Sequence, residues 1–292
     1  MNPLKMQDIH IRDPFVLVHE GKYYMYGTRG HTCWGEATGF DVYVSDDLKN
    51  WSEPQACFEN DGSFWADRHY WAPEVHQWND AFYMFASFKH PDVCRGTAIL
   101  RAENPKGPFL PHSDGPVTPR EWECLDGTFY VSKAGKPYMV FCHEWLQAVD
   151  GEVCAVELTE DLRAAANKPF LLFRASEAEW GKPVQHSTGM SGWVTDGPFL
   201  WRTTDGTLLC LWASFSESGY TQAVAVSDNG DIDGKFHQSA PLFMKDGGHG
   251  MIFRSLDDQL YLTLHTPNTT PQERPHLYPV TEQGTRLVLL KR

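Results

Sequence analysis

The hydrophobic residues of this chain fall into short runs that come in pairs, and a tight polar turn separates the two runs of each pair. The first pair lies in "RDPFVLVHEGKYYMYGT", and similar pairs begin at residues 72, 125, 195 and 248. The turns read "HEGK", "WNDA", "KAGK", "TDGT" and "LDDQ", which are typical of β-hairpins. Amphipathic helical periodicity is nearly absent, and the best short helical candidate is "TEDLRAAANKP". The pattern therefore predicts an all-β protein.

Each pair of runs continues into one or two weaker apolar runs, so the same unit recurs five times along the chain. "GFDVYVSDDLKNW" ends the first unit and "QAVAVSDNGDIDGKF" ends the fourth. Repeats of this length, each resembling a four-stranded sheet, predict a five-bladed β-propeller. We expect residues 1–292 to form this propeller as a single domain. A sandwich of two sheets with several hairpins is the alternative.

An acidic or polar residue close to Gly or Pro opens each unit. In this alignment Asp13, Glu74, Asp126, Asp196 and His249 hold equivalent positions. The first strand of a propeller blade faces the central channel, so these side chains are expected to converge at one end of it. Carboxylates gathered in one funnel repel one another, and they would disperse unless a function kept them there. A pair of carboxyl groups, one ionised and one kept protonated, is what glycoside hydrolysis requires.

Composition narrows the class of ligand. The formal net charge of −13 argues against a nucleic acid or an anionic membrane as partner, because either would favour a basic face. The chain has 11 Trp, 11 Tyr and 17 Phe, and such rings suit the flat apolar faces of sugars. Trp71 and Trp145 flank unit openings and are candidates for binding a sugar, with packing between blades as their alternative role. A neutral carbohydrate is therefore the expected ligand, and the oligomeric state stays open.

Three features favour a cytoplasmic location. The N-terminal segment "MNPLKMQDIHIRDPF" lacks a basic stretch followed by an apolar run, so no signal peptide is expected. No stretch approaches the apolar length of about 18 residues that a membrane span needs. The seven Cys residues are scattered, lack zinc-binding spacing, and mostly lie in apolar runs where Cys acts as a small buried side chain.

Five motifs occur in the order "IRDPFVL", "WAPEVHQW", "LDGTFYV", "TDGPFLW" and "GHGMIF", and together they resemble glycoside hydrolase family 43 over essentially the whole chain. The chain is most similar to the branch of single-domain α-L-arabinofuranosidases and β-xylosidases, which carries runs like "TGFDVYVSDDLKNW", "PHSDGPVTP" and "FRASEAEW". The resemblance implies a catalytic five-bladed propeller and an inverting mechanism. It also implies that Asp13 is the general base and that Asp126 orients the acid and tunes its pKa. His249 matches a channel histidine that is often found near a structural calcium or other cation, so it is a candidate for binding a metal or the sugar; no organic cofactor is implied.

The general acid is the point at which this sequence departs from the family, whose members mostly carry Glu in an "EGP" motif. The matching stretch here is "TDGP", which puts Asp196 at that place with a side chain one methylene shorter. Glu144 in "VFCHEW" competes for the role, because the second strand of the third unit returns to the same funnel. Register favours Asp196, whereas side-chain reach and an apolar setting favour Glu144, which we place first. Glu217 in "ASFSES" ranks third.

These features predict an exo-acting hydrolase that removes a terminal pentose from oligosaccharides derived from hemicelluloses such as xylan. α-L-Arabinofuranose is the first choice of sugar, followed by β-D-xylose and then β-galactose. Because the "EGP" Glu is missing, a sugar-binding propeller without catalysis is the alternative from another class. Glu74 is expected to bind substrate or to pair with an Arg or His side chain. Pocket depth and loops such as "RGHTCWGEATGF" decide which sugar fits.

Overall fold

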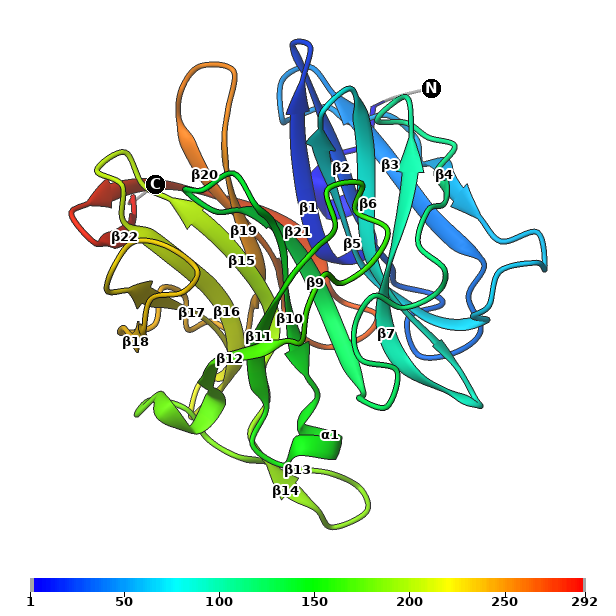
Figure 1. Cartoon of the computed structure of the whole chain (residues 1–292). Coiled ribbons are helices and arrows are strands. Elements are labelled where there is room, and N and C mark those ends of the chain that lie inside the picture. Colours follow the sequence, from blue (N-terminus) through cyan, green and yellow to red (C-terminus); the bar gives the residue numbers. More distant parts are fainter. Residues whose placement is uncertain (1–2, 291–292) are drawn as a thin grey trace.

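Five antiparallel sheets of four strands each surround a central axis in the computed structural model of this protein, which describes residues 3–290 (Figure 1). The sheets follow one another along the chain, and neighbouring strands within a sheet are consecutive in sequence. This architecture confirms the predicted all-β class and the five-bladed β-propeller.

Each blade uses four consecutive strands, the first of which lies nearest the channel. Blade 1 contains β1 (Ile11–His19), β2 (Lys22–Arg29), β3 (Gly39–Ser45) and β4 (Gln55–Glu59). Blade 2 contains β5 (Arg68–Trp78), β6 (Ala81–His90), β7 (Val93–Ala102) and β8 (Leu110–Pro111). Blade 3 contains β9 (Cys124–Val131), β10 (Pro137–His143), β11 (Glu152–Glu157) and β12 (Phe170–Arg174).

Blade 4 contains β15 (Asp196–Arg202), β16 (Leu208–Ser216), β17 (Gly219–Ser227) and β18 (Phe236–Gln238). Blade 5 contains β19 (Gly248–Arg254), β20 (Leu260–Thr266), β21 (Arg274–Gln283) and β22 (Arg286–Leu289). The remaining elements are short: η1 (Met6–Asp8), α1 (Trp145–Ala148), η2 (Ala175–Glu177) and the hairpin of β13 (Val184–Gln185) and β14 (Ser191–Gly192).

The five predicted hairpin turns all lie between the first and second strands of a blade, as expected. The helical candidate at residues 159–169 is wrong, because this segment forms turns between β11 and β12. Leu162 has a positive φ of 58°, and the Thr159 hydroxyl donates a hydrogen bond to Asp161 over 2.7 Å. Side-chain bonds of this kind compete with helical backbone bonds and favour turns.

The first strand of every blade contains a β-bulge near its start at which the antiparallel register slips by one residue, and β5 contains two such slips. Each blade has a positive-φ residue at such a slip: Asp13, Ala72, Asp126, Gly197 and His249; His69 has a positive φ at the earlier slip of β5. The bulge bends the strand next to the channel and re-aims the side chains around it. The same local device therefore brings residues of five blades to one end of the axis.

The bulges correct the alignment made from sequence at two of its five positions. Asp13, Asp126 and His249 do hold equivalent places, each at the positive-φ residue of its bulge. Glu74 lies two residues beyond the corresponding Ala72, and Asp196 lies one residue before Gly197. The alignment from sequence matched the acidic residues of the units. In the structure the equivalent positions are instead the bulge residues with positive φ, and Glu74 and Asp196 are offset from these positions.

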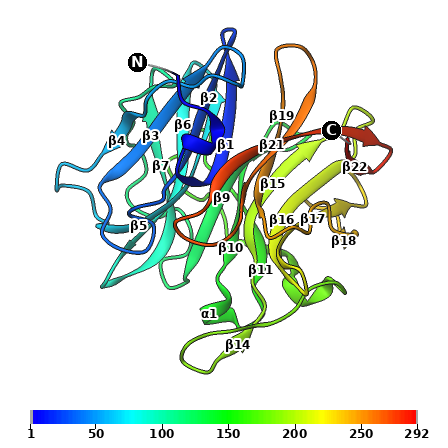
Figure 2. The same cartoon turned by 180° about the vertical axis from the view of Figure 1, so that it is seen from behind.

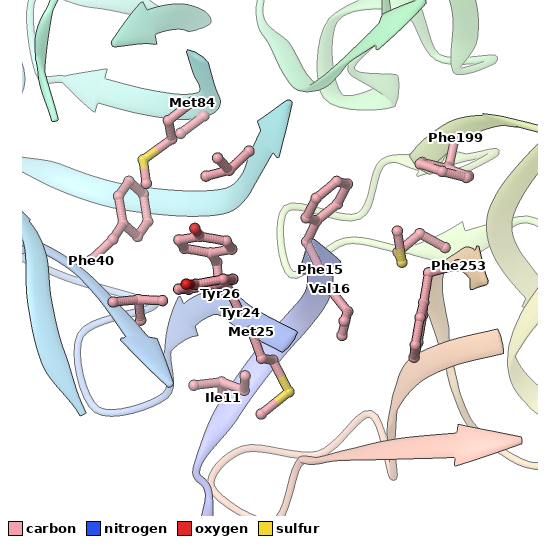
Figure 3. Close-up of a cluster of buried hydrophobic side chains, with 14 of the residues drawn as sticks. Ile11, Phe15, Val16, Tyr24, Met25, Tyr26, Phe40, Met84, Phe199 and Phe253 are labelled. Carbon is pink, nitrogen blue, oxygen red and sulfur yellow. The ribbon is translucent and has the colours of Figure 1, made fainter. Parts of the chain in front are cut away.

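The hydrophobic core lies between the blades and, among the described residues, falls into three clusters. Figure 3 shows part of the cluster that joins blade 1 to its neighbours, including Phe15, Met84 and Phe199. Phe15 and Phe199 meet edge to face, with ring centroids 6.3 Å apart. Aromatic pairs of this geometry pack well between twisted sheets. The abundance of aromatic residues is therefore explained in large part by packing between blades.

Blades 1 and 5 meet without sharing a strand, so side chains close the ring. Figure 2 shows β21 of the last blade beside β1 of the first. The Leu256 N–H donates to the Tyr23 hydroxyl over 2.9 Å, and Arg12 forms an ion pair with Glu273. The Asp13 backbone N–H donates to His265 Nδ1 over 3.1 Å. We call this junction the blade 1–5 seam.

Gly39 in β3 provides a direct test of the packing within blade 1. A Cβ atom at this position would lie 2.0 Å from the Phe58 carbonyl oxygen of the neighbouring strand. Gly39→Ala should therefore lower the free energy of unfolding by about 1–3 kcal/mol through overpacking. Gly35→Ala is the matched control, because a Cβ there meets nothing within 4 Å, and its effect should stay within about 0.5 kcal/mol. Equal urea midpoints for the two variants would contradict this packing.

Candidate active site

A cavity of about 600 Å³ opens at the end of the channel where the innermost strands begin, which is the end that carries α1 and β14 in Figure 1. All five blades contribute to its wall. The lining residues are Arg12, Asp13, Trp34, Trp71, Leu125, Asp126, Glu144, Trp145, Val184, Gln185, Val194, Asp196, Phe215, Tyr220, His249, Asn268 and Thr270. Every predicted site residue except Glu74 and Glu217, the third-ranked candidate for the acid, lies on this wall.

Three aspartates surround the imidazole of His249 at the base of the cavity. His249 Nδ1 lies 3.3 Å from Asp13 Oδ1 and 3.6 Å from Asp126 Oδ2. Burial alone would lower the pKa of His249, but the negative charges of Asp13, Asp126 and Asp196 outweigh burial and raise it. The protonated imidazole therefore compensates part of the negative charge that the three carboxyl groups bring together.

Asp13 is held in its ionised form. Burial would raise the pKa of Asp13, but the positive charges of His249 and Arg12 and a hydrogen bond from Thr28 lower it below its ordinary value of 3.8. The Thr28 hydroxyl donates to Asp13 Oδ2 over 2.6 Å. An ionised carboxylate at the base of a cavity is suited to accept a proton from water.

Asp126 and Asp196 differ from Asp13 because their pKa values are raised. Burial is the main cause for both, with nearby negative charge adding to it, and the pKa reaches about 7 for Asp126 and about 6 for Asp196. Asp126 Oδ2 accepts the Gly197 N–H over 3.0 Å, which ties it to the residue next to Asp196. The Tyr220 hydroxyl donates to Asp196 Oδ2 over 3.1 Å. The site therefore contains one ionised carboxylate and a coupled pair that holds a proton near neutral pH.

Glu144 lies on the cavity wall next to α1, so β10 does return it to the predicted funnel. Arg95 donates a hydrogen bond to Glu144 Oε2 over 2.5 Å within an ion pair. Burial raises the pKa of Glu144, and Arg95 opposes that shift. Glu217, the third candidate acid, is 82% exposed and pairs with Lys182 on the surface, so its predicted place in the funnel is wrong.

Aromatic side chains form much of the wall of the cavity. Trp71 stacks on His69 with centroids 4.9 Å apart, and the Arg95 guanidinium lies 4.0 Å from the centre of its ring. Trp34 meets Trp71 edge to face at 5.5 Å and donates its indole N–H to the Thr270 hydroxyl over 2.9 Å. These contacts fix the rings in place, which suits a surface that binds a sugar.

Glu74 lies outside the main cavity and does not belong to its wall. Its Oε2 accepts a hydrogen bond from Thr128 over 2.6 Å and lies 3.0 Å from His76 Nε2. Together with Asp13 and His249 it lines a separate small cavity of about 10 Å³. The expected pairing with a histidine is present, but the position does not support the expected contact with substrate.

A cation site at His249 is not supported by the residues present. Among residues 3–290, no group of three or more His, Cys, Asp and Glu side chains is arranged to hold a metal ion. His249 instead faces two carboxylates that favour its protonated form, and a protonated ring nitrogen has no lone pair for a metal. The side chains therefore do not fit the cation implied by the resemblance, and we derive no step through it.

Sequence reasoning missed four residues of the site: Arg95, Tyr220, His265 and Asn268. Arg95 and Tyr220 lie on third strands, β7 and β17, where no motif marked them. His265 is fully buried near the end of β20 in the run "YLTLHTPN". A histidine within such an apolar run is a signal that sequence reasoning could have used.

A curated relative corrects the predicted location. The chain is 23% identical over 269 residues to the extracellular exo-alpha-(1->5)-L-arabinofuranosidase of Cellvibrio japonicus (strain Ueda107), covering 86% of this chain and 72% of the relative. This relative contradicts the cytoplasmic expectation. The Cys argument fails because six of the seven free Cys are buried, so they report packing and not the redox state of a compartment. Within the described residues, no helix has the length and apolar character that crossing a membrane requires.

Solved structures and a family model identify the fold and the family of the chain. The crystal structure of an endo-arabinase from Bacteroides thetaiotaomicron is 36% identical, with a TM-score of 0.91 and coverage of 98% of this chain and 99% of that one. A β-xylosidase/α-arabinofuranosidase from a compost metagenome, solved with xylotriose in a calcium-free form, shares the fold at 15% identity, with a TM-score of 0.74 and coverage of 99% and 97%. The family model for glycosyl hydrolases family 43 matches residues 2–289. The chain therefore belongs to glycosyl hydrolases family 43 and is a glycoside hydrolase.

Proposed function

We propose that this protein is an inverting, exo-acting glycosidase that releases terminal α-L-arabinofuranose from arabinose- or xylose-containing oligosaccharides. The observation that carries the proposal is the group of three aspartates around His249 at the base of the cavity. One carboxylate favours the ionised state and the Asp126–Asp196 pair holds a proton near neutral pH, which matches the base and acid roles that glycoside hydrolysis requires.

Asp13 acts as the general base in this mechanism. A water oxygen attacks the anomeric carbon while Asp13 takes a proton from that water, and the bond from the anomeric carbon to the leaving oxygen breaks. The low pKa of Asp13 keeps it ionised over the working pH range. Attack by water on the face opposite the leaving group inverts the configuration at the anomeric carbon.

We assign the general acid to Asp196 in preference to Glu144. Asp196 is the more exposed to the cavity of the two carboxyls in the coupled pair, and its pKa of about 6 favours a proton at mildly acidic pH. Burial and the negative charge of Asp13 discourage its ionisation, and Asp126 is tied to the neighbouring residue Gly197. Glu144 already forms an ion pair with Arg95, whose positive charge opposes the rise that burial causes in the pKa of Glu144. Asp196 gives its proton to the leaving oxygen as the glycosidic bond breaks.

The form of the cavity supports attack at a chain end. Trp34 and Thr270 stand on the side of blades 1 and 5, Trp71 on blade 2, and Phe215 on blade 4. On the side of blade 3, Trp145 and the β13–β14 hairpin, through Val184 and Gln185, complete the rim. A rim supplied by every blade favours a pocket for one terminal sugar over a groove that a polymer crosses. An endo-arabinase among the similar structures makes internal cleavage the result that would contradict this.

Product analysis tests the sugar, the bond position and the stereochemistry together. The enzyme is supplied with nitrophenyl α-L-arabinofuranoside, β-D-xyloside and β-D-galactoside, and separately with a linear arabino-oligosaccharide. We expect turnover of the arabinofuranoside first, free arabinose as the initial product, and a first-formed β-anomer in the proton NMR spectrum. Faster turnover of the xyloside would change the assigned sugar, but it would leave the proposed exo action and the proposed inversion unchanged. Short oligosaccharides as initial products would refute exo action, and a first-formed α-anomer would refute inversion.

A further inference from the structure

His265 connects the last blade to the backbone of Asp13. Its side chain is completely buried, and Nδ1 lies 3.1 Å from the Asp13 backbone nitrogen. Asp13 is the positive-φ residue of the first bulge, with φ of 53°. A non-glycine residue in this conformation is strained by roughly 1–3 kcal/mol and persists when its surroundings hold it there.

The neighbouring hydrogen bonds determine the tautomer of His265. Arg12 donates to Asn268 Oδ1 over 2.8 Å, so the oxygen of this amide faces Arg12. The same oxygen lies 3.1 Å from His265 Nε2, which must therefore carry the hydrogen. A neutral imidazole with hydrogen on Nε2 has a lone pair on Nδ1, and this lone pair accepts the Asp13 N–H.

Burial and charge keep His265 neutral. The pKa of His265 is lowered to about 4, mainly by burial; Arg12 and His249 also lower it, while Asp13 and the hydrogen bond with Asn268 oppose the shift. A protonated ring would point a second N–H at the Asp13 N–H, and the two donors would repel. His265 Nδ1 also lies 3.3 Å from Asp13 Oδ1, but a nitrogen without hydrogen cannot donate to that oxygen.

We propose that His265 is a positioning residue that holds the Asp13 backbone, and hence the general base, through the bond from the Asp13 N–H to Nδ1. The proposal rests on the assignment of Asp13 as base. Asn268 fixes the required tautomer, and Arg12 fixes Asn268, so the chain of bonds runs from the cavity rim to the base. A displacement of the base by about 1 Å is enough to lower the rate about 100-fold.

Two amide substitutions test the two hydrogen bonds of His265 separately. In His265→Asn the side-chain oxygen replaces Nδ1 and still accepts the Asp13 N–H, while the bond to Asn268 is lost. In His265→Gln the terminal amide nitrogen replaces Nε2 and still donates to Asn268, while the acceptor for Asp13 is lost. Both variants place an amide at the same buried position, so they serve as controls for each other in stability.

We expect His265→Gln to lower kcat about 100-fold with KM changed less than about threefold, and His265→Asn to lose no more than about tenfold in kcat. Melting temperatures of the two variants should be similar. Equal kcat losses in the two folded variants would overturn the proposal, and so would a greater loss in His265→Asn.

If either buried variant fails to fold, Asn268→Ala provides a second test, because residue 268 is partly exposed on a loop. It should lower kcat about tenfold by freeing the tautomer of His265, and unchanged kcat would overturn the proposal. Asp13→Ala is measured in parallel. If Asp13→Ala keeps wild-type activity, the proposed function itself fails, whereas an inactive Asp13→Ala with equal His265 variants refutes only this inference.

Discussion

Asp13→Ala is expected to lower kcat by about 10⁴-fold, the upper end for loss of a general base, with a smaller effect on KM. The reason is that Asp13 is the carboxylate whose pKa lies below its ordinary value, and it faces the cavity between His249 and Thr28. Initial rates on nitrophenyl α-L-arabinofuranoside, measured together with circular dichroism, provide the test.

Glu217→Gln is the matched control for this substitution. Glu217 is an acidic residue on the same face of the blades, but it is exposed and pairs with Lys182 outside the cavity. We expect wild-type kcat and KM from it. A folded Asp13→Ala variant with kcat within tenfold of wild type would remove Asp13 from the mechanism.

Asp196→Asn should have the second largest effect, about a 10³-fold loss of kcat on an arabino-oligosaccharide. The loss should be much smaller on the nitrophenyl glycoside, because nitrophenolate is a stable anion and leaves with little help from a proton. Glu144→Gln should not show this dependence on the leaving group. The ratio of rates on the two substrates, determined for wild type and both variants, identifies the acid.

The pH profile gives an independent measure of the same assignment. In wild type, kcat/KM should rise with pH as Asp13 ionises below its ordinary pKa of 3.8, and fall as the Asp126–Asp196 pair, with pKa values of about 7 and about 6, loses its proton. The fall occurs because a general acid acts only in its protonated form. Asp196→Asn should abolish the descending limb, whereas Glu144→Gln should keep it. The opposite result would make Glu144 the acid.

The sequence was sufficient to predict the propeller because the hairpin signal is local and repeated. Each turn combines Gly, Asp or Asn with flanking apolar runs, and such signals need no knowledge of distant residues. The carboxylates Asp13 and Asp126 were found for the same reason, since each sits in a motif at the start of a blade. The helix expected at residues 159–169 is absent, because local hydrogen bonds from side chains stabilise turns there in place of helical backbone bonds.

The partners of the carboxylates could not be read from the sequence, because they come from other strands or blades. Arg95 on β7 engages Glu144 on the next blade, and this contact is what weakens the first-choice assignment of the acid. Tyr220, which bonds to Asp196, lies 24 residues away on a strand without a motif. Such contacts depend on blade packing, and no spacing rule reveals them.

The blade 1–5 seam has a consequence for how the enzyme becomes active during its synthesis. Asp13 leaves the ribosome early, but its partner His265 lies 252 residues further along the chain. A nascent chain of four blades already contains Asp13, Asp126 and Asp196, yet Asp13, the proposed base, still lacks the bond from its N–H to His265. Because domains fold as their segments emerge, we expect full activity only after translation of blade 5 has delivered His249 on β19 and His265 on β20 to the open edge of the ring.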